Sequence, residues 1–210
     1  MIDMRSLGAI LIACLALTCH AAGDAAWVLQ AQTDGPLQTT HPNARHYGAP
    51  WIWVGVKSQT LRLLDGWGLT QKEYTVSTAK NGVGETSGSY QTPRGWHTVC
   101  DKIGDGAAEN TIIFRRQVTP WKYTPTLHAQ YPNKDWILTR ILWLCGQEAG
   151  RNQGGKVDSY DRAIYIHGAG DHVPWGQPSS LGCIRMKNRD VIELFDAAPN
   201  GIDVWIDENS

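Results

Sequence analysis

The stretch IHGAGDHVPWGQPSSLGCIRM, residues 166–186, places a histidine sixteen positions ahead of a cysteine. A cysteine attacks as its thiolate, and near neutral pH it needs a base or a cationic neighbour to reach that state. His167 can supply this base for Cys183. Gly182 allows a sharp turn before the cysteine, so the amides of Gly182 and Cys183 can converge on one point and stabilise an oxyanion. The pattern predicts a thiol nucleophile with its base, although a buried histidine and a structural cysteine would look the same in sequence.

A metal site is the other chemistry that these residue types allow. His167, His172 and Cys183 offer only three spread ligands, and the chain has no Cys-x-x-Cys or His-x-x-x-His spacing. Zinc sites in proteins are usually built from such closely spaced pairs. We therefore expect neither a metal nor another cofactor.

The surrounding sequence predicts a mostly β domain. Short runs of alternating, β-branched or aromatic residues, separated by Gly, Pro and polar turns, are typical of strands. His167 ends one such run, and the segment after Cys183 is expected to be a short strand that leads into a helix beginning at Asn188. The long excursion at 104–160 is expected to form a wall or lid of the site. The strand candidates are residues 51–56, 60–64, 70–78, 96–101, 111–115, 136–143, 162–167 and 202–206.

The first 22 residues have the pattern of a secretory signal peptide. A charged start ends at Arg5, an apolar run covers the eleven residues 7–17, and small residues follow at Ala21 and Ala22. Such a run is too short to span a membrane, which takes about 20 residues. We predict a signal peptide at 1–22, a loosely structured lead-in at 23–49 and one catalytic domain at 50–210, with no stable membrane span after cleavage.

Export changes how the five cysteines are counted. Cys14 and Cys19 leave with the signal peptide, and three cysteines remain in an oxidising compartment. An odd number suggests one pair and one free thiol. We therefore predict a disulfide between Cys100 and Cys145, with Cys183 left free. The alternative is that all three are buried and reduced, acting as small hydrophobic residues.

Composition excludes some classes of protein. Hydrophobic residues make up 42% and charged residues 19% of the chain, as in globular domains. The 19 basic and 20 acidic residues leave a net charge of −1, so nothing attracts the chain electrostatically to nucleic acid or to an anionic membrane.

Residues 167–186 resemble the signature of the L,D-transpeptidases with a YkuD-type catalytic domain. That signature is His-Gly, a spacer, then Ser-x-Gly-Cys-x-Arg. The stretches YTVSTAKNGVGET and QTPRGWHTV resemble two further segments of the family, and RILWLCGQEAGRN to IYIHG looks like its short exported members in Gram-negative bacteria. The resemblance covers residues 51–207. The matching signature positions are His167, Gly168, Ser180, Gly182, Cys183 and Arg185.

The resemblance implies a twisted β-sandwich with one or two short helices, a cysteine acyl-enzyme, and a location in the periplasm of a Gram-negative bacterium. Peptidoglycan stem peptides would be the substrate, and we expect a monomer. Cys183 would attack the bond between diaminopimelate and D-alanine, while His167 takes and returns the proton. The amine of a second stem peptide, or of a lipoprotein lysine, would then resolve the thioester.

Several residues of the signature keep two interpretations. Arg185 is either a hook for a substrate carboxylate or a strut that ties the loop to backbone carbonyls. Ser180 is expected to shape the turn or to support the motif. Leu181 stands where many members of the family have histidine, so acceptor choice or activity can differ. The group that orients the histidine is expected to be a backbone carbonyl, or alternatively Asp161 or Asp171.

The ten tryptophans invite a role in binding sugars. Most of them must pack in the core of a β domain. Trp67, Trp96, Trp121 and Trp175 lie near turns, and Trp175, between His167 and Cys183, is the one that we expect to contact substrate.

Two other functions stay open. One is hydrolysis on the same scaffold, by an L,D-carboxypeptidase or a cross-link endopeptidase, because water can replace the amine acceptor. The other is a non-catalytic wall-binding module, against which the intact pair of Cys183 and His167 argues.

Overall fold

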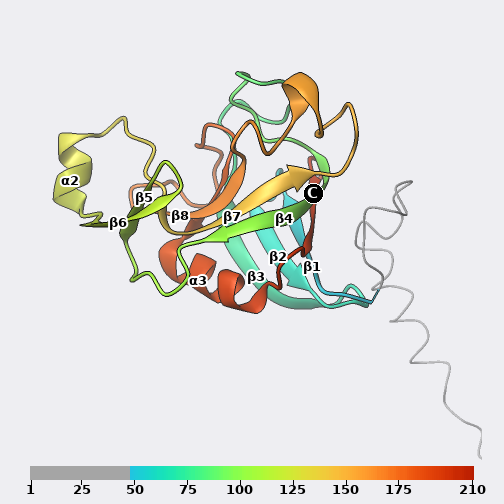
Figure 1. Ribbon diagram of the computed structural model, residues 1–210, viewed down its shortest axis with the longest axis horizontal. Coiled ribbons are helices and arrows are strands. Elements are labelled where there is room, and N and C mark those ends of the chain that lie inside the picture. The colour runs from blue at the N-terminus through green and yellow to red at the C-terminus, as the bar shows by residue number, and fades with distance from the viewer. Residues whose placement is uncertain (1–47) are drawn as a thin grey trace, which may run out of the picture.

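A computed structural model describes residues 48–210 (Figure 1). The predicted signal peptide and residues 23–47 of the predicted lead-in lie outside the described residues. Within the described part, no helix is both long enough and apolar enough to cross a membrane.

The described residues form ten strands, two α-helices and one short 3-10 helix. This confirms the expected mostly β fold with one or two short helices. The elements are β1 Trp51–Gly55, β2 Thr60–Leu64, β3 Thr70–Ser77, β4 Gly95–Ile103, β5 Thr111–Phe114, β6 Gln117–Lys122, α2 Pro125–Gln130, β7 Leu138–Gly146, η2 Gly155–Val157, β8 Tyr165–Ala169, β9 Ile184–Lys187, α3 Asn188–Ala197 and β10 Asp203–Asp207.

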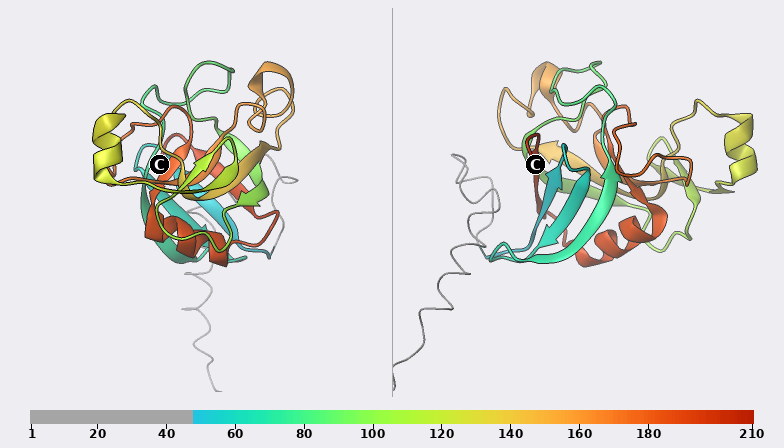
Figure 2. Two further views of the ribbon diagram at one scale, coloured as in Figure 1. Left: turned by 60° about the vertical axis from the view of Figure 1, so that its left-hand side comes forward. Right: turned by 180° about the vertical axis from the view of Figure 1, so that it is seen from behind.

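The strands make one twisted sheet that closes on itself. Their order is β4-β10-β1-β2-β3-β9-β8-β7-β5-β6, and β4 also pairs with β7. The hairpin of β5 and β6 therefore extends the sheet beyond the point of closure. Figures 1 and 2 show this hairpin and α2 standing out to one side of the molecule, while α3 lies across the sheet near β8 and β9.

The core fills the space inside the closed sheet and beneath α3. Ile166 of β8 and Ile184 of β9 are fully buried in the main cluster, together with Val191 and Leu194 of α3. Side chains alternate between the two faces of a strand. The same alternation that sends Ile166 and Ile184 into the core turns the residues on either side of them to the opposite face.

Besides the short 3-10 helix η2, two elements were not expected from sequence, α2 and β6. The hydroxyl of Thr124 caps α2 by accepting a hydrogen bond from the N–H of Leu127 at 3.1 Å, and Pro125 stands in the first turn. A Thr-Pro pair of this kind is a helix-start signal. β6 contains Pro120 and has no buried residue, so its sequence lacks the alternation that marks a half-buried strand.

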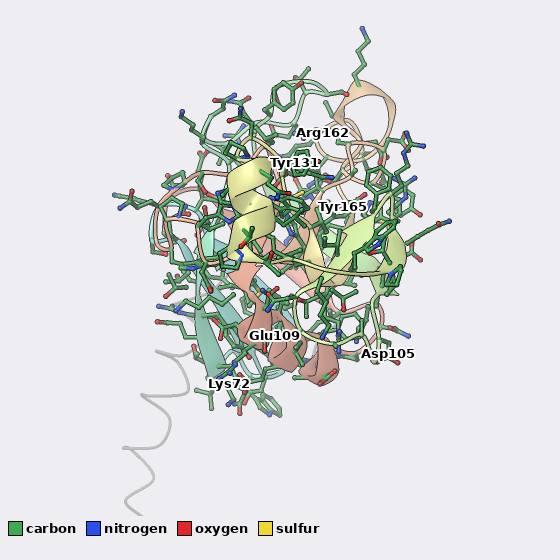
Figure 3. All side chains as sticks on the ribbon, turned by 90° about the vertical axis from the view of Figure 1, so that its left-hand side faces the viewer. Lys72, Asp105, Glu109, Tyr131, Arg162 and Tyr165 are labelled. Atoms are coloured by element: carbon green, nitrogen blue, oxygen red, sulfur yellow. A yellow bond between two sulfur atoms is a disulfide. The ribbon has the colours of Figure 1, made fainter. Side chains whose placement is uncertain are left out.

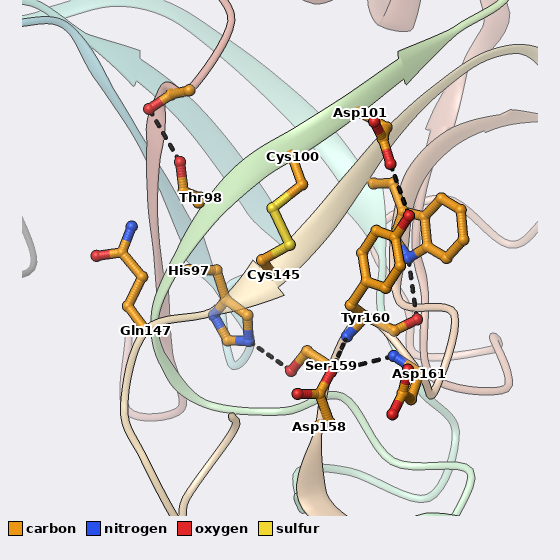
Figure 4. Close-up of a disulfide and its surroundings, with 12 residues drawn as sticks. His97, Thr98, Cys100, Asp101, Cys145, Gln147, Asp158, Ser159, Tyr160 and Asp161 are labelled. Atoms are coloured by element: carbon orange, nitrogen blue, oxygen red, sulfur yellow. Dashed lines mark hydrogen bonds between the residues drawn. A yellow bond between two sulfur atoms is a disulfide. The ribbon is translucent and has the colours of Figure 1, made fainter. Parts of the chain in front are cut away.

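A disulfide joins Cys100 of β4 to Cys145 of β7, with the two Cα atoms 5.8 Å apart. This confirms the predicted pairing, and Cys183 is the free cysteine of the described residues. The pairing of β4 with β7 shifts register between Val99 and Asp101, so Cys100 sits at the irregular point (Figure 4). The bond therefore fastens the two strands whose pairing closes the sheet.

We predict that replacing both cysteines, Cys100→Ser with Cys145→Ser, lowers the free energy of unfolding by about 4 kcal/mol. The reason is that the bridge spans a sequence separation of 45 and restricts the unfolded chain. Denaturant unfolding of the oxidised wild type and the double variant measures the difference. An unchanged unfolding midpoint would show that the bond contributes nothing to stability.

Candidate active site

The catalytic candidates lie side by side on two neighbouring strands. β8 and β9 run parallel, with Ile166 opposite Ile184 and His167 opposite Arg185. Because Ile166 and Ile184 point into the core, Tyr165 and His167 on one strand and Cys183 and Arg185 on the other face the opposite side. The parallel pairing thus puts the histidine and the cysteine that the sequence singled out on the same face of the sheet.

His167 is fully buried, and its ring has one defined partner. Nδ1 lies 2.8 Å from the carbonyl oxygen of Gly168. A carbonyl can only accept, so Nδ1 carries the proton and Nε2 presents its lone pair. Within residues 48–210, Nε2 has no hydrogen-bond partner. Burial lowers the pKa of His167, so the ring is neutral and ready to accept a proton.

The Gly168 carbonyl is the orienting group that the sequence left open. It occupies Nδ1, so neither Asp161 nor Asp171 is needed to fix the tautomer. Gly168 is also required by packing, because a Cβ there would run into Asn188 Oδ1 and the Leu138 carbonyl.

Cys183 is held as a neutral thiol. Its Sγ donates to the carbonyl of Ala163 and accepts from the N–H of Tyr165, each at 3.4 Å. Burial, with a smaller contribution from the negative charge of Asp135, raises the pKa of Cys183 to about 12. The resting pair is therefore thiol and imidazole, and the thiol must turn from Ala163 toward His167 before it can be activated.

The turn before the cysteine is built by hydrogen bonds from two segments. Gly182 has φ +132°, a conformation that favours glycine. Its carbonyl accepts from the hydroxyl of Thr92 at 2.9 Å, which belongs to the QTPRG segment. Ser180 accepts from the N–H of Gly182 at 3.2 Å and donates to the carbonyl of Cys183 at 2.5 Å. Ser180 thus shapes the turn, and the amide of Gly182, one of two expected to face an oxyanion, is directed at Ser180.

Arg185 has the contacts of a strut. It forms an ion pair with Asp135 at 2.6 Å and donates to both the carbonyl and the hydroxyl of Ser179 at 3.2 Å. These contacts tie the loop before β9 to the segment before β7. Asp135 is a residue that sequence reasoning missed, because no local spacing connects it to the motif 50 positions away.

Arg162 was also missed. Its guanidinium donates to the carbonyls of Gly84, Glu85 and Gln91. Its positive charge acts to lower the pKa of Cys183, although burial outweighs it. Figure 3 shows Arg162 and Tyr165 on the side of the molecule where α2 stands in front. The only signal in the sequence is an arginine at the entrance to the strand that carries the histidine.

The remaining candidates are more peripheral. Leu181 is 56% exposed, so the position where the family often has histidine opens to solvent. Trp175 is half-buried in the loop between β8 and β9. His172, in the same loop, accepts or donates a 2.8 Å hydrogen bond with the Tyr123 hydroxyl. Residues 48–210 contain no group of three or more His, Cys, Asp or Glu side chains arranged to hold a metal ion.

Comparison with known proteins identifies similar sequences. Residues 49–206 match a family model described as YkuD, the L,D-transpeptidase catalytic domain. The protein named "Putative L,D-transpeptidase YkuD" from Bacillus subtilis (strain 168) is 43% identical over 61 residues, which cover 27% of this chain and 37% of that protein. ErfK/SrfK of Escherichia coli (strain K12), described as a probable L,D-transpeptidase, is 29% identical over 134 residues, which cover 63% of this chain and 37% of that protein. The matches thus span little more than a third of the length of these relatives.

Solved structures of L,D-transpeptidases are similar at lower identity. L,D-transpeptidase LdtMt1, solved in complex with imipenem, is 17% identical, with 76% of this chain and 59% of that chain covered and a TM-score of 0.46. L,D-transpeptidase 3 from Mycobacterium tuberculosis is 16% identical, with coverages of 76% and 61% and a TM-score of 0.47.

We predict that Cys183 reacts slowly with iodoacetamide from pH 6 to pH 9, because burial raises the pKa of Cys183 to about 12 and only the thiolate is alkylated. The rate should keep rising with pH beyond the range in which an ordinary thiol, with a pKa of about 8.5, has levelled off. Mass analysis of the labelled protein gives the rate at each pH. A rate that reaches half its maximum near pH 8.5, as for an ordinary thiol, would contradict the neutral resting pair.

Proposed function

Because this chain belongs to the YkuD family of L,D-transpeptidase catalytic domains, we propose that it is an exported peptidoglycan L,D-transpeptidase that works through a cysteine acyl-enzyme. The observation that carries the proposal is the resting pair: the half-buried free thiol of Cys183 lies on the same face of the sheet as a neutral histidine whose Nε2 is open and whose Nδ1 is fixed by Gly168. This arrangement can transfer a proton and form a covalent bond without a metal or cofactor.

In the first step, the thiol of Cys183 gives its proton to Nε2 of His167, and Sγ attacks the carbonyl carbon between diaminopimelate and D-alanine of a stem tetrapeptide. The carbonyl oxygen takes up negative charge, and the backbone N–H of Cys183 is the donor that we assign to it. The bond to the D-alanine nitrogen then breaks. That nitrogen receives the proton from His167, D-alanine leaves, and a thioester remains on Cys183.

In the second step, the amine of an acceptor attacks the thioester. His167 takes a proton from the amine and returns it to the departing sulfur, so the enzyme is restored. The acceptor is a second stem peptide or a lipoprotein lysine. Ser180, Gly168 and Arg185 act through the shape of the site, because their polar contacts are internal. Trp175, which is half-buried, and Leu181, which is exposed, lie between β8 and β9 and are proposed to contact substrate.

We propose that residues 1–22 direct export to the periplasm of a Gram-negative bacterium and that 50–210 is the mature catalytic domain. The disulfide between Cys100 and Cys145 supports this location, since such bonds persist in oxidising compartments. It also leaves one free thiol in the described domain, which suits a cysteine acyltransferase. We propose that the protein acts as a monomer.

We predict that imipenem adds its mass once to the wild type and not at all to Cys183→Ala, because Cys183 is the nucleophile. Imipenem is chosen because it is bound to LdtMt1 in its solved structure. His167→Ala should slow the adduct by about a hundredfold or more, which is the usual contribution of a positioned base. Intact mass spectrometry over time gives both results. An adduct on Cys183→Ala would refute the assignment of the nucleophile.

We predict that purified disaccharide-tetrapeptide incubated with the enzyme yields a cross-linked dimer and free D-alanine. In this exchange two tetrapeptides lose one D-alanine and form one new amide bond. Mass analysis separates the alternatives: a shortened monomer would indicate an L,D-carboxypeptidase, and unchanged substrate a wall-binding module. Cys183→Ala is the control, and any product that it forms must come from another enzyme.

A further inference from the structure

An open groove lies beside the site on the part of the molecule that projects from the closed sheet. It has a volume of about 490 Å³, and neither Cys183 nor His167 lines it. Figures 1 and 2 show the projection, made of β5, β6 and α2. The groove is lined by Ile112, Phe114, Trp121, Lys122, Leu127, Tyr131, Lys134 and Trp136.

The walls of the groove contain aromatic side chains that are exposed and lie outside the core. Trp121 is 65% exposed, and Phe114 and Tyr131 are also more than half exposed. No residue of β6 or α2 is buried, so neither element is held mainly by its own apolar contacts. Apolar surface gathered in a concave site is typical of ligand binding rather than of folding. Tyr131 is labelled on α2 in Figure 3.

Residues 110–134 carry charge of a single sign, and the carboxylate of the next residue, Asp135, is paired with Arg185. The chain from 110 to 134 contains no Asp or Glu, although the whole protein has a net charge of −1. Lys122 and Lys134 both line the groove. Lys134 Nζ lies 4.8 Å from the ring centre of Trp136 and 5.6 Å from that of Phe114. The lysine charge is thus offset by aromatic faces, and it remains available to an anionic ligand.

The groove shares a wall with the catalytic site. Lys134 and Trp136 line the groove, while Asp135 between them forms the 2.6 Å ion pair with Arg185, two residues after Cys183. Trp136 also packs against Tyr123 at 5.6 Å, and the Tyr123 hydroxyl is bonded to His172 in the loop between β8 and β9. A ligand in the groove would therefore lie next to the loop that carries the nucleophile.

We propose that this groove binds a sugar ring of the peptidoglycan strand together with a carboxylate of the attached peptide. This inference rests on the proposed function and extends it from the scissile bond to the glycan. Exposed Trp, Phe and Tyr faces can stack on the C–H face of a sugar, and the two lysines pair with the carboxylate. The exposed tryptophan that matters is then Trp121, whereas Trp96 is part of the core.

The test is calorimetric titration of the protein with a soluble disaccharide-tripeptide prepared from peptidoglycan. This probe lacks the fourth residue, so it offers no bond for Cys183 to cleave. Trp121→Ala should raise the dissociation constant for the disaccharide-tripeptide by about tenfold, which is the usual contribution of a good aromatic contact. Trp67→Ala is the matched control, because Trp67 is equally exposed at 65% but lies in the turn between β2 and β3.

The charge of the ligand is tested separately. The double variant Lys122→Gln with Lys134→Gln should weaken binding of the disaccharide-tripeptide several-fold and leave binding of N,N′-diacetylchitobiose, a disaccharide that carries no carboxylate, unchanged. An equal loss for both probes would show that the lysines do not recognise a carboxylate. Tripeptide without sugar that binds as tightly as the full probe, with the same dependence on Trp121, would overturn the sugar assignment.

Two further outcomes separate this proposal from the proposed function. Trp121→Ala should form the imipenem adduct at the wild-type rate, because imipenem carries no glycan. If the wild type forms no imipenem adduct but still binds the sugar, the proposed function alone is overturned. Equal sugar binding by wild type, Trp121→Ala and Trp67→Ala would overturn the groove alone. Trp121-dependent binding to phosphatidylglycerol vesicles, with no binding of sugar, would assign the groove to a membrane surface instead.

Discussion

The parallel pairing of β8 with β9 is the constraint on which the rest of this structure depends. It places His167 opposite Arg185 and fixes which side chains share a face. If either strand slipped by one residue, its side chains would turn to the other face of the sheet, and its catalytic residue would take the place of the buried isoleucine beside it. The fully buried Ile166 and Ile184 therefore stabilise this register, since exposing them would lose the free energy gained by burying two large side chains.

Cys183 and His167 are both neutral in the resting site. Many reactive cysteines are kept as thiolates by a cationic neighbour. Here burial and Asp135 keep Cys183 protonated, and the nearby guanidinium groups of Arg162 and Arg185 are occupied with carbonyls and a carboxylate. A neutral pair avoids the cost of two poorly solvated charges at rest. Charge then develops only when a substrate arrives, which is the condition under which preorganised donors are most effective.

Different elements around this pair support the turn, close the sheet and border the site. The turn from Ser180 to Cys183 is supported by Thr92 from a segment 90 positions earlier in the chain. The disulfide fastens the β4–β7 seam behind it. The projection of β5, β6 and α2 meets the loop before the nucleophile where His128 of α2 stacks on His172, with ring centres 3.9 Å apart. Tyr123 and Asp135, on either side of α2, add the contacts with His172 and Arg185. Rigid elements thus hold the chemistry, while a less buried appendage can vary what is brought to it.

The local features could be predicted from the sequence: the strand-forming alternation, the helix from 188 to 197, and the histidine and the cysteine turn. The sequence favoured a bond between Cys100 and Cys145, but the close approach of their Cα atoms came from the fold. These predictions depend on residue type, short spacing and redox context, all of which are read along the chain. Tertiary structure alone decided that Gly168 orients His167, that Asp135 and Arg162 border the thiol, and that Trp121 rather than Trp175 faces a groove. Those relations join residues far apart in sequence through strand register and packing, and no local pattern encodes them.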